Sequence, residues 1–298
     1  MVTATAGTVL GNPVISAERY ATGVVLPGGV ALKRRGVAPV AAGRGARGII
    51  TGFSKSSRRR MVDKLMRLDW NAGKAFFLSL TFHESYGLDA SRWHLALKLF
   101  RLRLEYRYGE RLAGAIWRLE VLPRKSGIHR GELAPHYHLL LCWQGGREPR
   151  VESFRRWCSE AWTCVCEPGD GAHLAHGADV QVVHERNGRG ALLSYCSKYL
   201  AKPGDVHLAD PATGELLSVG RCWGIWRNPP FLVVCALAIT GEGWNRLVAA
   251  VREHGQRVGS WYLSHLSPLV SGFRVFGEFS WLWNTFLESC PGIEVVPC

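Results

Sequence analysis

The chain has 298 residues, of which 47% are hydrophobic and 20% are charged. This composition is sufficient for a buried core, so the chain as a whole is not a disordered protein. The formal net charge of +13 favours a polyanionic partner such as a nucleic acid.

Membrane and secretory classes are disfavoured by the apolar pattern. The longest apolar run, FLVVCALAI at 231–239, is nine residues long, whereas a membrane-spanning helix needs about 20. The N-terminal residues lack the pattern of a secretory signal, and nine cysteines without such a signal fit a reducing compartment. We therefore expect a cytoplasmic protein that does not cross a membrane.

Positive charge is concentrated at the start of the chain. Residues 1–60 contain ten Lys and Arg residues against one acid, Glu18. Residues 1–50 are rich in Gly, Ala and Val and have little periodicity, which predicts a flexible basic arm. We expect a folded domain over 51–228 and a C-terminal extension without a readable motif over 229–298.

The first predicted elements of the folded domain follow in chain order. Ser56 or Ser57 can cap a helix whose apolar stripe is Met61, Leu65 and Leu68. Residues 75–82, AFFLSLTF, predict a buried strand. Residues 91–108 predict an amphipathic helix with a basic outer face. Its apolar positions are Trp93, Leu97, Phe100 and Leu104.

The next elements alternate between strands and helices. Residues 115–122 and 135–143 predict two strands joined by a long basic turn. A helix over 152–163 and a strand over 178–185 follow. The order indicates an α+β fold in which helices pack on a central antiparallel sheet.

Two histidines on the strand 135–143 suggest a metal site. Side chains alternate along a strand, so His136 and His138 share one face while Tyr137 and Leu139 share the other. Two imidazoles so placed can chelate one divalent ion, and Glu120 on the preceding strand can add a carboxylate. A chance H-x-H on a strand is the alternative.

A second group of metal-ligand residues lies between 158 and 176. Its members are Cys158, Cys164, Cys166, His173 and His176. Their spacing does not match the paired Cys and His knuckles of structural zinc sites, and free cysteine is a common core residue. We therefore favour burial of these residues in the core over a zinc site.

Residues 195–202, YCSKYLAK, repeat two residue types at helical spacing. On a helix, Tyr195 and Tyr199 lie one turn apart on one face, and Lys198 and Lys202 form a second such pair. The segment alone is also compatible with an ordinary half-buried surface helix.

Three of these motifs in this order resemble a known family. FFLSLTF, PHYHLLL and YCSKYLAK, with a Glu on the strand before the second motif, look like the three motifs of the HUH endonucleases, the rolling-circle replication initiators of plasmids and small single-stranded DNA phages. The two-tyrosine motif is most similar to microvirus-type phage initiators and related plasmid Rep proteins. GFSKSSRRRM and GRCWGIW also resemble segments of bacterial Rep proteins, so the likeness covers about residues 50–228.

The resemblance implies a role for each matching residue. Glu120, His136 and His138 would hold Mg²⁺ or Mn²⁺, Tyr195 would attack DNA phosphorus and Tyr199 would make the second attack. The expected substrate is single-stranded DNA at a replication origin, and the free 3′-OH would prime a host polymerase. The sequence contains no GxxxxGK[ST] motif, so strand separation would need a host helicase.

The lysines of the third motif can be explained by the chemistry of the tyrosines beside them. A phenol of pKa ~10 is a weak nucleophile at neutral pH unless nearby cations favour its phenolate. Lys198 and Lys202 can provide such a field beside the two tyrosines.

Two other functions remain compatible with the sequence. A basic single-strand-binding protein without chemistry fits the charge and the twelve tryptophans, but it leaves the histidine pair and the tyrosine segment unexplained. A relaxase or transposase would use the same strand-transfer chemistry in another genetic setting. Substitution of both tyrosines separates catalysis from pure binding.

Overall fold

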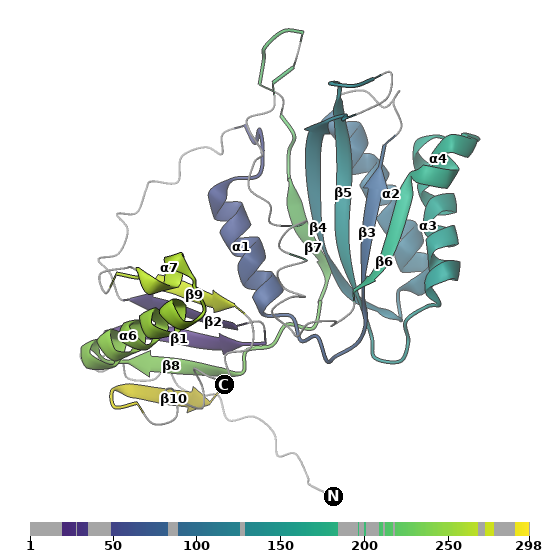
Figure 1. Cartoon of the computed structure of the whole chain (residues 1–298). Helices are drawn as coiled ribbons and strands as arrows, with labels where there is room; N and C mark the ends of the chain where they lie inside the picture. Colours follow the sequence, from purple (N-terminus) through teal and green to yellow (C-terminus); the bar gives the residue numbers. More distant parts are fainter. Residues whose placement is uncertain are drawn as a thin grey trace, which may run out of the picture.

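The computed structural model describes most of the chain. The described residues are 20–27, 29–34, 49–82, 89–125, 129–183, 196, 200, 209–210, 212–216, 218–267, 272–276 and 290–297. They form a mixed α/β structure with two antiparallel sheets, which is compatible with the predicted α+β class, although one central sheet was expected (Figure 1). Within these ranges no helix is long and apolar enough to cross a membrane.

The larger sheet has the strand order β6-β3-β5-β4-β7, with every neighbouring pair antiparallel. Its strands are β3 (Ala75–Thr81), β4 (Leu112–Pro123), β5 (Leu133–Trp143), β6 (Ala178–Val183) and β7 (Trp223–Arg227). The predicted strands 75–82, 115–122 and 135–143 are therefore confirmed, and the strand predicted over 178–185 is confirmed for its described residues, 178–183. The histidine motif lies on the central strand, β5.

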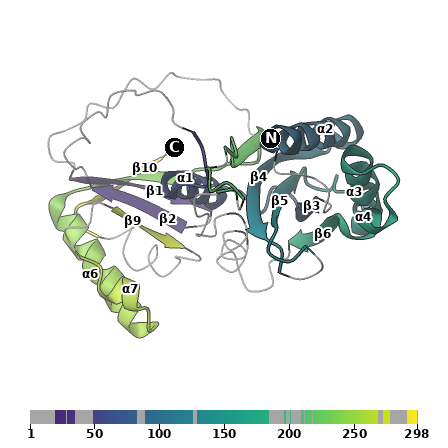
Figure 2. The same ribbon diagram turned by 90° about the horizontal axis from the view of Figure 1, so that it is seen from above.

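Helices α2 (Ala90–Tyr108) and α3 (Val151–Cys166) cover one face of this sheet (Figure 2). α2 begins after Asp89, whose carboxylate accepts a hydrogen bond from the amide of Ser91 at 2.9 Å. Its four predicted apolar positions are all buried. Phe154 and Trp162 of α3 pack against aromatic rings of β3 and the residue after it. The short helix α4 (Gly171–His176) follows α3.

Helix α1 (Lys55–Met66) lies on the opposite side of the sheet from α2 and α3 (Figures 1 and 2). Its cap is Ser54, whose hydroxyl accepts from the amide of Ser57 at 3.2 Å, so the helix begins earlier than the predicted Ser56 or Ser57 cap. Met61 and Leu65 are fully buried, as their spacing predicts.

The second sheet joins the two ends of the chain, in the order β10-β8-β1-β2-β9. Its strands are β1 (Ala21–Leu26), β2 (Gly29–Arg34), β8 (Cys235–Ile239), β9 (Gly272–Phe276) and β10 (Ile293–Pro297). Helix α6 (Gly241–Arg257) packs on this sheet through Trp244, Leu247 and Val251, and the short α7 (Trp261–Ser264) follows it.

The second sheet combines strands from two of the predicted segments. Ala21–Leu26 and Gly29–Arg34, within the range predicted to be a flexible basic arm, form strands, and β8, within the predicted C-terminal extension, pairs with β1. The strands are short and rich in small residues. β1 pairs with the adjacent β2 and also with β8, which is more than 200 residues away in sequence. Local periodicity therefore gave no sign of the pairing between β1 and β8.

The segment that follows β7 is hydrogen-bonded both to the residues after α1 and to β1 of the second sheet. The amide of Asp69 donates to the Pro230 carbonyl at 2.8 Å, and the amide of Val234 donates to the Val25 carbonyl at 2.9 Å. Leu26 of β1 belongs to the main hydrophobic core rather than to the core under α6. The second sheet is therefore anchored to the larger one through residues just after α1 and after β7.

Candidate functional site

The histidine pair and Glu120 meet on one face of the larger sheet. Glu120 of β4 is the direct cross-strand partner of His136 of β5, and His138 lies two residues further along the same face. Nε2 of His138 lies 3.3 Å from Oε2 of Glu120, within hydrogen-bonding distance. The structure thus brings together three residues that are separated by up to eighteen positions in sequence.

Two hydroxyls of β3 hold the imidazole rings from the other side. Ser79 lies opposite His138, and its Oγ is 3.0 Å from Nδ1 of that ring. Thr81 lies opposite His136, and its Oγ1 is 3.2 Å from Nδ1. Because Nδ1 of each ring has a hydroxyl partner, Nε2 is the nitrogen that can contact Glu120 or bind a ligand.

The backbone of Thr81 is itself fixed by three hydrogen bonds. Its carbonyl accepts from Nε1 of Trp162 and from Nε2 of His173, both at 2.9 Å. Its amide donates to the Gly177 carbonyl at 2.8 Å. These contacts from α3, α4 and the following residue hold the end of β3, and thereby the hydroxyl that orients His136.

Burial controls the charge of His136. Its pKa is lowered to about 4, chiefly by burial, then by the neighbouring His138 and by Arg124, while Glu120 acts in the opposite direction. At neutral pH the ring is therefore neutral, which is the form that binds a metal ion.

Arg118 is a buried cation beside this cluster, with 1% of its surface exposed. Its Nη2 lies 3.8 Å from Oε1 of Glu120, and its guanidinium lies 4.6 Å from the ring centre of Phe53. Its Nη1 donates to the main-chain carbonyl of Leu200 at 3.4 Å. A cation here offsets the cost of burying the Glu120 carboxylate.

The tyrosine motif lies largely outside the described residues. Tyr195, Lys198, Tyr199 and Lys202 are not among them, whereas Cys196 and Leu200 are, both helical and both fully buried.

The two described residues of the motif lie against the face that carries the histidine pair. Leu200 accepts from Arg118, and burial raises the pKa of Cys196, to which nearby Cys142 of β5 also contributes. Cys142 is four residues after His138 and therefore on the same face of β5.

The donor set of Glu120, His136 and His138 suits a divalent ion that also binds phosphate oxygens. Among the described residues, however, no group of three His, Cys, Asp or Glu side chains is arranged as a metal site. Because His138 and Glu120 hydrogen-bond to each other, an ion would have to replace that bond. The residue types suit a metal ion, and the hydroxyl partners of the two Nδ1 atoms leave the Nε2 atoms for it. The 3.3 Å between Nε2 of His138 and Oε2 of Glu120, however, is the distance of a hydrogen bond in a metal-free site.

The Cys and His residues between 158 and 176 do not converge. Cys158 and Cys166 are buried, and burial raises the pKa of both thiols. Cys164 is exposed and accepts a hydrogen bond from Nη2 of Arg103 at 3.2 Å, while His173 is bound to the Thr81 carbonyl. These residues serve the core and the support of β3.

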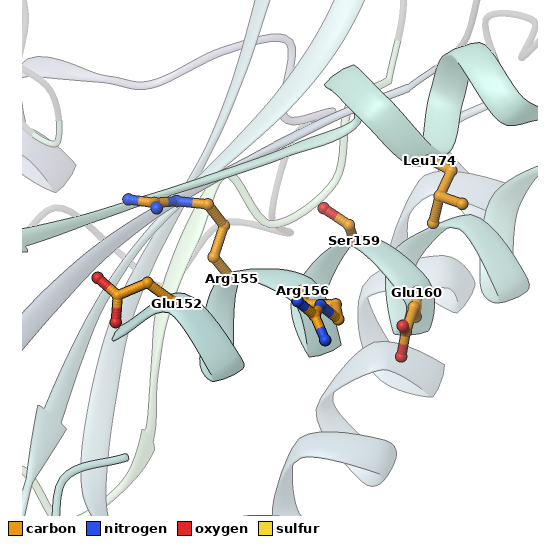
Figure 3. A pocket seen from close by; sticks show the side chains of 6 residues that line it. All are labelled: Glu152, Arg155, Arg156, Ser159, Glu160 and Leu174. Carbon is orange, nitrogen blue, oxygen red and sulfur yellow. The ribbon is translucent and has the colours of Figure 1, made fainter. Parts of the chain in front are cut away.

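A surface hollow lies on α3 and α4, which cover the other face of the sheet (Figure 3). It is lined by Glu152, Arg155, Arg156, Ser159, Glu160 and Leu174. Arg155 is held by a hydrogen bond to the Val180 carbonyl at 2.9 Å. Mixed charges line this hollow, and none of the residues predicted for catalysis or metal binding is among them.

Sequence reasoning missed Arg118 and the roles of Ser79 and Thr81. The available signal was strand alternation, because Arg118 is two residues before Glu120 and so shares its face.

Comparison of the chain with family models, curated proteins and solved structures gives no match.

Proposed function

We propose that this protein is a two-tyrosine HUH endonuclease that nicks single-stranded DNA at a replication origin and rejoins strands during rolling-circle replication. One observation carries the proposal. Glu120, His136 and His138 share one face of the central sheet, and the described residues of the YCSKYLAK segment, Cys196 and Leu200, pack against that same face.

The proposed first step is attack by Tyr195 on a backbone phosphorus. The tyrosine loses its phenolic proton, and its oxygen forms a bond to phosphorus while the bond to the 3′ oxygen breaks. The 3′ oxygen takes up a proton and leaves as a free 3′-OH, and the 5′ phosphate stays on the tyrosine. Lys198 and Lys202 favour the phenolate because they place positive charge beside it.

Glu120, His136 and His138 would hold Mg²⁺ or Mn²⁺ in this proposal. When bound, such an ion polarises the scissile phosphate and stabilises charge on the leaving oxygen. Neutral His136 is ready to act as a ligand at neutral pH, and the Ser79 and Thr81 hydroxyls keep both rings turned toward the site. Arg118 places a buried cation next to the Glu120 carboxylate.

Tyr199 provides the second nucleophile. The phosphotyrosine bond conserves the energy of the phosphodiester, so a 3′-OH can reseal the strand without ATP. While Tyr195 carries the DNA end, Tyr199 attacks the newly copied junction, and the released strand closes into a circle. A host polymerase extends the 3′-OH, a host helicase separates the strands, and the protein acts in the cytoplasm.

The test uses a single-stranded oligonucleotide from the replicon that encodes the protein. We expect a covalent adduct, seen as a mass shift, that persists in part in Tyr195→Phe and in Tyr199→Phe and disappears in the double variant. EDTA and the His136→Ala/His138→Ala variant should abolish nicking but leave much of the DNA binding, which Lys and Arg carry. Binding without any adduct would favour a non-catalytic single-strand-binding protein.

A further inference from the structure

Helix α2 is apolar on two opposite faces. Its inner face packs on the larger sheet, as predicted, but its outer face is not simply basic. Four large apolar side chains there are exposed to solvent: Leu95 (54%), Leu99 (41%), Leu102 (52%) and Tyr106 (95%). We call these four residues the outer stripe. Figure 2 shows α2 running along the outside of the molecule.

The spacing of the outer stripe is that of a helix-packing seam. Its residues follow one another at intervals of four, three and four, which places them on one line along the helix. Such a seam accepts the apolar side chains of a second helix at the same spacing. Isolated exposed apolar residues are common, but four in register on one helix form a continuous surface.

The borders of the outer stripe are positively charged. Arg92, Lys98, Arg103 and Arg107 are all exposed on α2. The one acid in the helix, Glu105, accepts a hydrogen bond from Nε of Arg101 at 2.9 Å. A second copy of the chain would bring these cations against their own equivalents, whereas an acidic helix would neutralise them.

We propose that the outer stripe binds an amphipathic helix of a partner protein, with Leu-type residues at intervals of three and four and Asp or Glu along both borders. This inference does not depend on the nuclease proposal. α2 covers the face of the sheet that carries Tyr137, whose hydroxyl lies 3.2 Å from Nδ1 of His94, and the histidine pair occupies the other face. The partner could therefore bind while DNA occupies the candidate site.

Two synthetic three-heptad peptides test the proposal, both with Leu at positions a and d. One has Glu at e and g, and the other has Lys there. Fluorescence anisotropy with the full chain should show the acidic peptide binding at least about tenfold more tightly than the basic one. The Leu99→Gln/Leu102→Gln variant should bind the acidic peptide at least about tenfold more weakly, because the two substitutions remove the centre of the outer stripe without changing the charge of the protein.

Leu216→Gln/Val258→Gln is the matched control, because Leu216 (59%) and Val258 (55%) are at least as exposed as Leu99 and Leu102 but lie outside α2. It should bind the peptide like the unmodified protein, and both variants should keep the circular dichroism spectrum and their affinity for single-stranded DNA. No binding of the acidic peptide, or equal binding by the Leu99→Gln/Leu102→Gln variant, would overturn the proposal. Concentration-dependent dimerisation that this variant abolishes would instead assign the stripe to a second copy.

Discussion

Arg118 of β4 donates a hydrogen bond to the main-chain carbonyl of Leu200, 3.4 Å away, across 82 residues of sequence. The same guanidinium contacts Glu120, which in turn hydrogen-bonds to His138. A single buried cation thus connects the segment that carries the two tyrosines with the cluster that is the candidate metal site. Leu200, a described residue of that segment, is thus held by a side chain that is not itself one of the proposed metal ligands.

Replacing Arg118 by Met should destabilise the fold by on the order of 3 kcal/mol, because Glu120 would remain buried without its cation. Urea unfolding followed by tryptophan fluorescence measures the loss. Arg246→Met is the control, since Arg246 forms an exposed pair with Glu242 and its removal should cost about 0.5 kcal/mol or less. Similar losses in the two variants would contradict a special role for Arg118.

The hydroxyls on β3 should tune metal affinity. Ser79→Ala removes the hydroxyl that orients Nδ1 of His138, so Mn²⁺ binding should weaken by about tenfold or more. Ser79→Thr keeps the hydroxyl and should bind Mn²⁺ almost as well as the unmodified chain. Isothermal titration calorimetry compares the three proteins. Equal affinity in Ser79→Ala would mean that the hydroxyl does not orient a ligand.

Stability should depend on pH through His136. Its pKa is lowered from 6.5 to about 4 in the folded protein, so the unfolded chain takes up a proton at a higher pH than the folded chain. The unfolding free energy should therefore fall as pH decreases from 6.5 to about 4, by at most about 3 kcal/mol from this residue.

His136→Gln isolates this contribution. Urea unfolding in EDTA, which keeps metal off the site, should show a flatter pH profile for His136→Gln than for the unmodified chain over the same interval. The exposed His265 provides the control, and His265→Gln should leave the profile unchanged. Parallel profiles for His136→Gln and the unmodified chain would show that His136 is protonated as readily in the folded as in the unfolded state.

Cys196 reports on the packing of the tyrosine segment. Cys196 is fully buried. The nearby Cys142 is also buried, which raises the pKa of its thiol to about 12, whereas Cys164 is exposed. A thiol reagent followed by peptide mass mapping should modify Cys164 quickly and Cys142 and Cys196 only on unfolding, because buried thiols are inert. Labelling of Cys196 as fast as Cys164 would show that the segment is not held against the sheet.

The sequence predicted those parts of the fold in which local pattern and burial agree. The alternation around His136 and the 3.6-residue period of Trp93, Leu97 and Phe100 come from one buried face per element, so the strands, the helices and the pairing of Glu120 with the histidines were predictable. Arg118 was not, because its burial depends on Phe53, Glu120 and Leu200, which only the tertiary fold brings together. The outer stripe of α2 was not predicted, because leucines such as Leu99 and Leu102 are usually core residues and the sequence alone does not show that they are exposed.

The second sheet gives the last prediction, because its middle strand, β1, comes from the N-terminal part of the chain. Removal of residues 1–34 should expose the apolar face of α6, including Trp244 and Leu247, and destabilise that sheet by more than about 5 kcal/mol. Removal of residues 1–19 keeps β1 and β2 and serves as the control.

We expect the longer truncation to bind a hydrophobic dye and to be cleaved by trypsin within 229–298, while the shorter one resists both. Most of the core of the larger sheet comes from its own strands and from α1, α2 and α3, so these elements should stay resistant in both proteins. Protection of 229–298 after removal of residues 1–34 would mean that α6 and its strands are stable without the N-terminal hairpin, and that the two ends of the chain fold independently.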